Sequence, residues 1–525
     1  MCEDYLGCRY PQPSYLLVWL CYISSQFQLS HCTFYAVTLL FQIHGNALLL
    51  IIILGIGGSF HCGYHITGLS SPSPYIQHFI NSSWFNRYGE PPSPESATMV
   101  WSLVVSMFAV GGLFGVFSVK FFTGKLGCKR AMIGNNLISI IGAGVMLTSK
   151  WAQSFEMIII ARALFGFSAA LGTSLHLMYL GEISPRQIRG SVTLTSATFL
   201  SLGKLSGQFF GLTEILGGQD MWNIVLSVPA CLSLVQVLAL PFLPEPPRYL
   251  FIEKRDDKAC KKALQRLWGP GEYKQEMDEM LMEQLASEAA PPKSFLMLIR
   301  DRTVRWQLIT MSTIFCCNQL SGMSAISIFA FDIFVKAGIP KENVRYVTLG
   351  LGLSEIVTSL VSGLLIEYSG RRPLLWGGYG FMSLIWVLVT ITLNLKDTYY
   401  WISYLSAALI FLFFVFFCGG PGAATGTLNN ELFTQSNRLA AFALVGFLRW
   451  FMFAMQGLIF PFIIKTFGSY CFTLFALTSL LGSLYAFFIL PETKGKTLLE
   501  ISAEFKTISV CWKFWSKKET KETQL

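Results

Sequence analysis

The sequence predicts an all-α membrane protein, and three observations lead to that class. Of the 525 residues, 53% are hydrophobic and only 13% are charged, whereas soluble domains carry about 25% charged residues. Apolar stretches of about 20 residues, the length that crosses a bilayer, recur along the chain. They run without the alternation typical of barrel strands, and a helix satisfies its backbone polar groups within one segment. We therefore expect twelve transmembrane helices.

Hydropathy and helix-breaking residues place six helices in each half of the chain. The first six are expected at residues 46–70, 97–122, 130–148, 155–181, 190–213 and 221–243. The second six are expected at residues 304–334, 344–368, 374–393, 400–429, 440–464 and 470–490. Because the number of spans is even, both termini lie on one side of the membrane.

The remaining segments flank or separate two bundles, 46–243 and 304–490. Residues 1–45 hold apolar stretches too short to span a bilayer and are expected to form a poorly ordered extension. Residues 244–303 are rich in Lys, Glu and Asp with helix-like spacing, which predicts an insert of short amphipathic helices. Residues 491–525 are expected to be a cytoplasmic tail.

The charged residues between the helices set the orientation. Basic residues such as Lys125, Arg186 and Arg371 fall on one set of loops, which identifies that set, and both termini, as cytoplasmic. The net charge of +9 thus reflects membrane topology, and we expect no nucleic-acid partner. The longest loop of the other set, 71–96, carries a sequon that predicts glycosylation of Asn81.

Other chemistries find no support in the sequence. The 13 cysteines show neither the paired spacing of a zinc site nor a disulfide framework, so we expect no metal and no cofactor. A phosphate loop, paired intramembrane carboxylates and a Ser/His/Asp arrangement are not apparent either, so an enzyme is not expected.

An internal repeat relates the two halves. Three short motifs recur in the same order at offsets of 243 to 249 residues: Gly127-Cys128-Lys129-Arg130 as Gly370-Arg371-Arg372-Pro373, Glu182 and Arg189 as Glu431 and Arg438, and Pro244-Glu245-Pro246-Pro247-Arg248 as Pro491-Glu492-Thr493-Lys494-Gly495. Such a repeat indicates two homologous six-helix halves in parallel orientation.

Each copy of these motifs lies at an expected cytoplasmic helix end, where Glu and Arg side chains can meet. Single surface ion pairs contribute about 0–1 kcal/mol, but a network present in one conformation can bias an equilibrium between two. We predict a cytoplasmic latch made by Glu182, Arg189, Lys129, Arg130, Arg248, Glu367, Arg371, Arg372, Glu431, Arg438 and Glu492. The alternative is that these residues only determine topology.

These motifs, with Gln319-Leu320-Ser321-Gly322 and Gly420-Pro421-Gly422, resemble the signatures of the sugar porters of the major facilitator superfamily, and specifically the facilitative hexose transporters. Thr425-Gly426 and Glu355 make the chain most similar to the fructose-transporting class II branch, and within it to the eleventh and ninth members. The resemblance implies the major facilitator fold, two pseudo-symmetric six-helix bundles that alternate in access around a central site.

The implied function is uniport of a monosaccharide, fructose or glucose, across the plasma membrane. The partners expected are the small-molecule substrate and the lipid bilayer, with no obligate protein partner. A carrier of organic anions or heterocycles such as urate on the same scaffold, and a sugar sensor that does not transport, are the alternatives.

The resemblance also indicates substrate-binding residues. A sugar hydroxyl stripped of water costs a few kcal/mol if it stays unpaired, so polar residues on apolar helices are the candidates. In helix seven, Asn318 and Gln319 resemble the family's paired amides, and Ser324 replaces its following Asn. The helix-five residues that share one face are Ser201, Lys204 and Gln208.

Charges near the expected site leave two interpretations open. The resemblance places Lys204, Glu355 and Arg449, which precedes Trp450, around one cavity. Either Glu355 neutralises one cation and the other attracts an anion, or the charges pair internally and the cavity carries neutral hexose. His65 stands where proton-coupled porters have Asp, which favours uniport, although a histidine can itself titrate.

The motif Gly420-Pro421-Gly422 interrupts helix ten. Proline removes a backbone donor, so a local break or bend is expected there, and it could let half of the helix swing as a gate. Tight helix packing is the alternative role.

Overall fold

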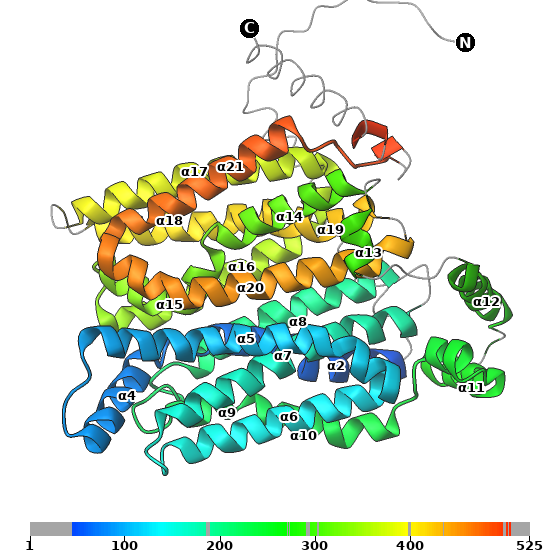
Figure 1. The fold of residues 1–525 in the computed structure, drawn as a ribbon, viewed down its shortest axis with the longest axis horizontal. Coiled ribbons are helices and arrows are strands. Elements are labelled where there is room, and N and C mark those ends of the chain that lie inside the picture. Colours follow the sequence, from blue (N-terminus) through cyan, green and yellow to red (C-terminus); the bar gives the residue numbers. More distant parts are fainter. Residues whose placement is uncertain are drawn as a thin grey trace, which may run out of the picture.

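The computed structural model consists of helices in two bundles that lie side by side (Figure 1). It describes residues 45–505 except 185–188, 270, 272, 290–294, 302–303, 397–398, 400, 434, 497–499 and 502. The predicted extension 1–45 therefore lies almost wholly outside the described residues. Figure 1 shows α4 at one end of the bundles and α11 and α12 at the other; we call these the α4 end and the insert end.

The first bundle contains the six predicted spans. Its elements are α2 (Gly45–Gly55), η1 (Ile56–Phe60), α3 (His61–Thr67), α4 (Ser73–Tyr88), α5 (Pro94–Leu126), α6 (Cys128–Ser149), α7 (Phe155–Ile183), α8 (Arg189–Phe210), α9 (Trp222–Ser227), α10 (Pro229–Ala239) and η2 (Leu240–Phe242). The sequence analysis described 71–96 only as a loop, but α4 occupies half of it. This helix follows Pro72 and ends at Gly89, which has a φ of 77°.

The insert contains η3 (Tyr249–Glu253), α11 (Asp257–Trp268), α12 (Lys274–Ala289) and α13 (Phe295–Arg300). Asp256 caps α11, because its side chain accepts a hydrogen bond from the N–H of Ala259. One face of α11 is buried, as expected for an amphipathic helix, and consists of Cys260, Ala263, Leu264 and Leu267.

The second bundle repeats the order of the first. Its elements are α14 (Arg305–Leu320), α15 (Met323–Lys336), α16 (Lys341–Ser369), α17 (Arg371–Leu395), α18 (Trp401–Phe417), η4 (Cys418–Gly422), α19 (Ala423–Leu432), α20 (Gln435–Phe467), η5 (Gly468–Cys471) and α21 (Phe472–Phe488). Helix seven is thus α14 and α15, and helix ten is α18, η4 and α19.

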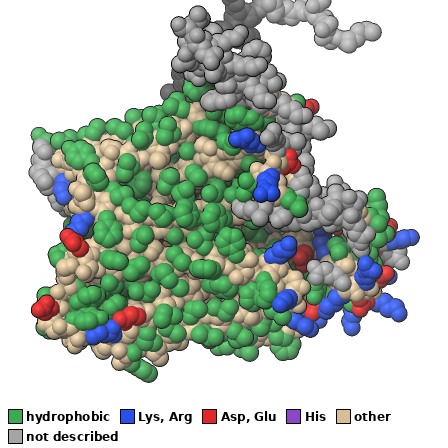
Figure 2. All heavy atoms as spheres, in the orientation of Figure 1, with side chains coloured by type: hydrophobic (Ala, Val, Ile, Leu, Met, Phe, Trp, Pro, Cys, Tyr) green, Lys and Arg blue, Asp and Glu red, His purple; other side chains and the backbone are tan. Residues whose placement is uncertain are grey.

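Length and hydropathy identify ten helical stretches among the described residues that could span a membrane. One of them, Ala440–Phe488, covers both α20 and α21, and the polar helix α8 is not among the ten. Counting α8 and separating α20 from α21 gives the twelve predicted spans. Figure 2 shows apolar side chains over the flank of the molecule and charged ones near its two ends, as a surrounding bilayer requires.

The two bundles meet where α5 packs against α20 and α8 packs against α16. Trp450 of α20 lies with its ring centroid 5.7 Å from that of Phe108 on α5. These two helix pairs bring together the polar residues of the central region.

Candidate functional site

Helix seven is broken at the centre of the second bundle. Gly322, between α14 and α15, has a φ of 100°, and a Cβ there would lie 2.7 Å from Trp386 and 2.8 Å from Phe475. Only glycine fits both conditions. The break leaves backbone carbonyls for side chains to bind: Gln456 Nε2 donates to the Gln319 carbonyl at 2.9 Å, and Trp386 Nε1 donates to that of Ser321 at 2.8 Å.

The three predicted helix-seven residues lie around this break. Gln319 Nε2 donates to Ser324 Oγ at 2.5 Å. Asn318 Nδ2 donates to the Pro421 carbonyl at 3.2 Å and to Thr425 Oγ1 at 3.1 Å. Asn318 therefore joins α14 to helix ten. We call Asn318, Gln319, Ser324, Thr425 and Gln456 the amide cluster.

Gln456 was not among the substrate-binding residues that the sequence predicted. A signal was available, because Gln456 lies seven residues after Arg449 on α20 and two helical turns bring such residues to one face. Gln456 is buried, and its Oε1 accepts no hydrogen bond from a described residue. The same holds for Oε1 of Gln208 on α8. Both amide oxygens can accept a hydrogen bond from a ligand hydroxyl.

The predicted charges also come together. Lys204 Nζ lies 2.5 Å from Glu355 Oε1, with side chains only 11% and 10% exposed. The pair joins α8 of the first bundle to α16 of the second. Arg449 is exposed and forms no salt bridge among the described residues. Cys62 lies within reach of the charges of both Arg449 and Lys204, which places all three in one region.

Three other predicted residues, His65, Trp450 and Ser201, are buried. His65 is buried in the first bundle, where its ring stacks on Phe165 at 4.2 Å and its carbonyl accepts a hydrogen bond from Arg162 at 3.1 Å. The described ring contacts of His65 all involve first-bundle residues, so the structure does not bring it to the amide cluster. Trp450 packs on Phe108, and Ser201 is buried on α8.

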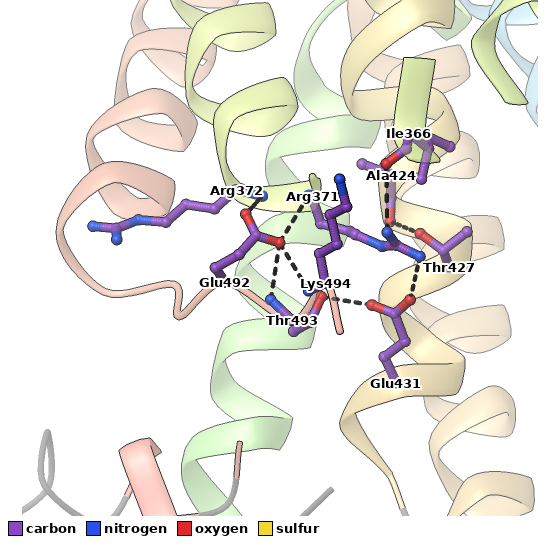
Figure 3. A network of polar contacts seen from close by, with 9 residues as sticks. All are labelled: Ile366, Arg371, Arg372, Ala424, Thr427, Glu431, Glu492, Thr493 and Lys494. Carbon is purple, nitrogen blue, oxygen red and sulfur yellow. Dashed lines mark hydrogen bonds and ion pairs between the residues drawn. The ribbon is translucent and has the colours of Figure 1, made fainter. Parts of the chain in front are cut away.

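Four predicted latch residues of the second half, Arg371, Arg372, Glu431 and Glu492, belong to the network in Figure 3. Arg371 Nη2 lies 2.7 Å from Oε1 of Glu431. The other carboxylate oxygen, Oε2, accepts a hydrogen bond from Thr493 Oγ1 at 2.5 Å. The Glu492 carboxylate accepts backbone N–H bonds of 3.0–3.1 Å from Arg371, Arg372, Thr493 and Lys494. Glu492 therefore caps the start of α17, where an anion is favoured by the helix dipole.

Opposing effects act on the Glu492 carboxyl. Burial is the largest single cause and raises its pKa, but the four backbone N–H groups together outweigh burial, so the pKa is lowered from 4.5. Glu492 is thus a charged helix cap, whereas the sequence analysis assigned it to an array of Glu–Arg pairs.

The described contacts of Lys129, a latch residue of the first half, involve backbone carbonyls. Lys129 Nζ donates to the carbonyls of Pro241 at 3.2 Å and Leu243 at 2.6 Å instead of to a carboxylate. Arg130 is exposed. Arg372 also binds a carbonyl, that of Phe487 at 2.5 Å. Lys129 and Arg372 thus bind backbone carbonyls instead of carboxylates, because nearby helix ends offer unpaired carbonyls.

The other latch residues divide into two groups. Glu182 and Arg248 line a pocket of about 240 Å³ beside Trp268 of α11. The side chains of Arg189, Glu367 and Arg438 lie outside the described residues. The predicted contact of Glu431 with Arg438 therefore stays a prediction, and Arg371 is the described partner of Glu431.

The remaining predicted sites are placed as follows. Gly420, Pro421 and Gly422 form the π-helical turn η4, so helix ten is distorted where the sequence predicts a bend; its gating role stays a prediction. Asn81 is exposed on α4, which leaves its glycosylation a prediction. Among the described residues, no group of three or more His, Cys, Asp and Glu could hold a metal ion.

Comparison with known proteins fits this architecture. Residues 50–505 match the family described as sugar (and other) transporter. The chain is 42% identical to the human protein named solute carrier family 2, facilitated glucose transporter member 9, over 86% of this chain and 83% of that protein. It is 38% identical to human member 5, over 89% and 93%, and to human member 11, over 89% and 94%.

Solved structures agree on the fold. The partially occluded inward open conformation of the xylose transporter XylE from E. coli superposes with a TM-score of 0.73 at 15% identity, covering 87% of this chain and all of that one. The class is therefore that of the major facilitator fold. The chain belongs to the sugar transporter family and, within it, to the facilitated glucose transporters of solute carrier family 2.

Proposed function

We propose that the protein is a uniporter that carries a monosaccharide, fructose or glucose, across the plasma membrane by alternating access. The insert end faces the cytoplasm in this proposal, because the basic loops gather there. The relatives named as facilitated glucose transporters support a hexose as substrate.

The observation that carries this proposal is the amide cluster. A hexose presents several hydroxyl groups, each of which needs a partner once it leaves water. The amide cluster offers amide and hydroxyl groups around the helix-seven break, and Gln456 Oε1 accepts no hydrogen bond from a described residue. The charges of Lys204 and Glu355 cancel within their pair, which leaves them compatible with a neutral substrate.

Arg449 supports a second candidate, the transport of an organic anion such as urate. Its guanidinium is exposed in the central region and has no carboxylate partner among the described residues. A positive charge without a carboxylate partner attracts an anion.

The test is uptake of labelled fructose, glucose and urate into proteoliposomes that contain the purified protein, with and without an imposed membrane potential. A neutral hexose carried alone moves no charge, so the proposal expects saturable hexose uptake that does not respond to the potential. Asn318→Ala and Gln319→Ala should each raise the half-saturating hexose concentration, whereas Arg449→Gln should change it little.

Other results would replace the proposal. Urate uptake that responds to the potential and is lost in Arg449→Gln, with hexoses inert, would establish the anion carrier. Tight sugar binding without uptake or counterflow would establish a sensor that does not transport.

A further inference from the structure

Four contacts join α8, or the loop after it, to α16 across the interface between the bundles, and three of them are polar. From the centre towards the α4 end, residue numbers rise along α8 and the loop after it and fall along α16. We call the series the α8–α16 seam, and its four levels pair Lys204 with Glu355, Gln208 with Gly352, Thr213 with Arg345, and Glu214 with Tyr346.

The inner two levels are buried and closely packed. The Lys204–Glu355 ion pair is 2.5 Å long. One turn further out, the side-chain amide of Gln208 packs against the backbone of Gly352, where a Cβ would lie 2.0 Å from Gln208 Oε1. Both levels therefore require α8 and α16 to be in contact.

Arg345 holds the outer part of the seam. Its Nη1 donates to Thr213 Oγ1 at 2.9 Å, and its Nη2 donates to the hydroxyl of Tyr75 at 3.3 Å. The guanidinium also lies over the rings of Tyr75 at 5.6 Å and Phe331 at 5.7 Å. Since Tyr75 and Thr213 belong to the first bundle, one side chain of α16 contacts that bundle at two points.

The seam belongs to a larger set of contacts between the bundles. Among the described residues, six hydrogen bonds join the bundles: Lys204 to Glu355, Arg345 to Thr213 and to Tyr75, Tyr346 to Glu214, the Phe331 N–H to Ser70, and Lys465 to the carbonyl of Pro94. These contacts hold the bundles together from the level of Lys204 towards the α4 end.

We propose that the α8–α16 seam is the outer gate of this transporter. The Lys204–Glu355 ion pair holds it closed near the centre, and Arg345 holds it closed nearer the α4 end. The inference rests on the proposed function, in which the α4 end faces outward. The substrate can enter from outside only after the seam separates, so Lys204, Glu355 and Arg345 set how often the site is open to the outside.

Separation has a defined consequence for the two inner charges. Lys204 and Glu355 face each other across the interface, so outward opening exposes both to the substrate path. Hydroxyl groups can donate to Glu355 and accept from Lys204, whereas an apolar molecule can do neither. The residues of the Lys204–Glu355 ion pair therefore also favour polyhydroxylated substrates.

Half-saturating concentrations measured from the two sides test the gate. An apparent dissociation constant equals the intrinsic one divided by the fraction of molecules open to that side. Arg345→Gln should lower the outside half-saturating hexose concentration about fivefold and leave the inside value unchanged or higher. Arg87→Gln is the matched control, because Arg87 also lies at the α4 end but pairs with Glu156 of its own bundle. The gate would be overturned if Arg345→Gln changed the half-saturating concentration equally on both sides. It would also be overturned if the ratio of the outside to the inside value matched that of Arg87→Gln.

A second measurement needs no substrate. Cysteines introduced by Glu214→Cys and Tyr346→Cys can be joined by a short bifunctional thiol reagent, detected after cleavage of a protease site placed in the insert. Single-cysteine variants supply the background. Adding Glu355→Gln should slow cross-linking at least fivefold, and exchanging the charges by Lys204→Glu with Glu355→Lys should restore it. An unchanged cross-linking rate in Glu355→Gln would refute the role of the Lys204–Glu355 ion pair in closing the gate. A slowed rate in a protein that moves no hexose would keep the gate and reject the proposed substrate.

Discussion

Replacing Gln456 with alanine tests the substrate site most directly, because this side chain has two separable roles. Its Nε2 donates to the carbonyl of Gln319 at 2.9 Å and so fixes the broken end of α14. Its Oε1 is buried and free to accept a hydrogen bond from a sugar hydroxyl. Each hydrogen bond contributes about 0.5–1.5 kcal/mol, and only the bond from the sugar hydroxyl to Oε1 counts directly towards binding. At about 1.4 kcal/mol per factor of ten, its loss weakens hexose binding about 2- to 12-fold.

The assay is equilibrium binding of labelled hexose to purified protein, together with half-saturating concentrations for uptake. Gln307→Ala is the matched control, since Gln307 is also a buried amide but lies on α14, close to the start of that helix at Arg305. Gln456→Glu separates the roles, because it keeps an acceptor and removes the donor. Binding that is unchanged in Gln456→Ala, or weakened equally in Gln307→Ala, would refute the assignment of Gln456 to the substrate site.

Three further predictions concern the latch, the helix cap and the surface. Glu431→Gln should slow hexose flux severalfold with little change in equilibrium binding, because it removes the ion pair with Arg371; unchanged turnover would contradict the latch. Glu492→Gln should lower stability by about 1–2 kcal/mol at pH 7. Because folding lowers the pKa of Glu492 from 4.5, this stability is present above about pH 4.5 and is lost as pH falls through the lower, folded value, so thermal unfolding at pH 7 and pH 3 should show the difference shrinking in acid. Asn81→Gln should remove an enzyme-sensitive glycan and raise gel mobility in protein made by glycosylating cells; equal mobility would show that the sequon is not used.

The repeat in the sequence does not produce equal networks in the two halves. In the second half, Glu492 caps α17 and Glu431 pairs with Arg371. In the first half, Cys128 occupies the position equivalent to Arg371 and donates to the Leu175 carbonyl at 3.5 Å. A thiol cannot form an ion pair with a carboxylate at neutral pH, so the two halves hold their helix ends by different contacts.

The sequence by itself determined the class, the number of spans and the approximate bounds of the twelve spans. The reason is that a bilayer accepts only segments that satisfy their own backbone, so long apolar runs such as 97–122 predict a helix like α5 without further information. The distortion of helix ten was also readable, because the proline at 421 acts through local backbone geometry. The break at Gly322, inside the expected span 304–334, was not predicted. The helix α4 was not predicted either, since its polar sequence lacks a hydropathy signal.

Contacts between side chains depended on the tertiary structure. The sequence placed Lys204 and Glu355 near one centre through the family resemblance, but it could not decide whether they pair, because they lie 151 residues apart on helices whose rotation sets the distance. Arg345 gave no sequence signal, and its partner Tyr75 is 270 residues away. Periodicity within one helix indicates which residues share a face, whereas the packing of α8 on α16 decides which face meets which.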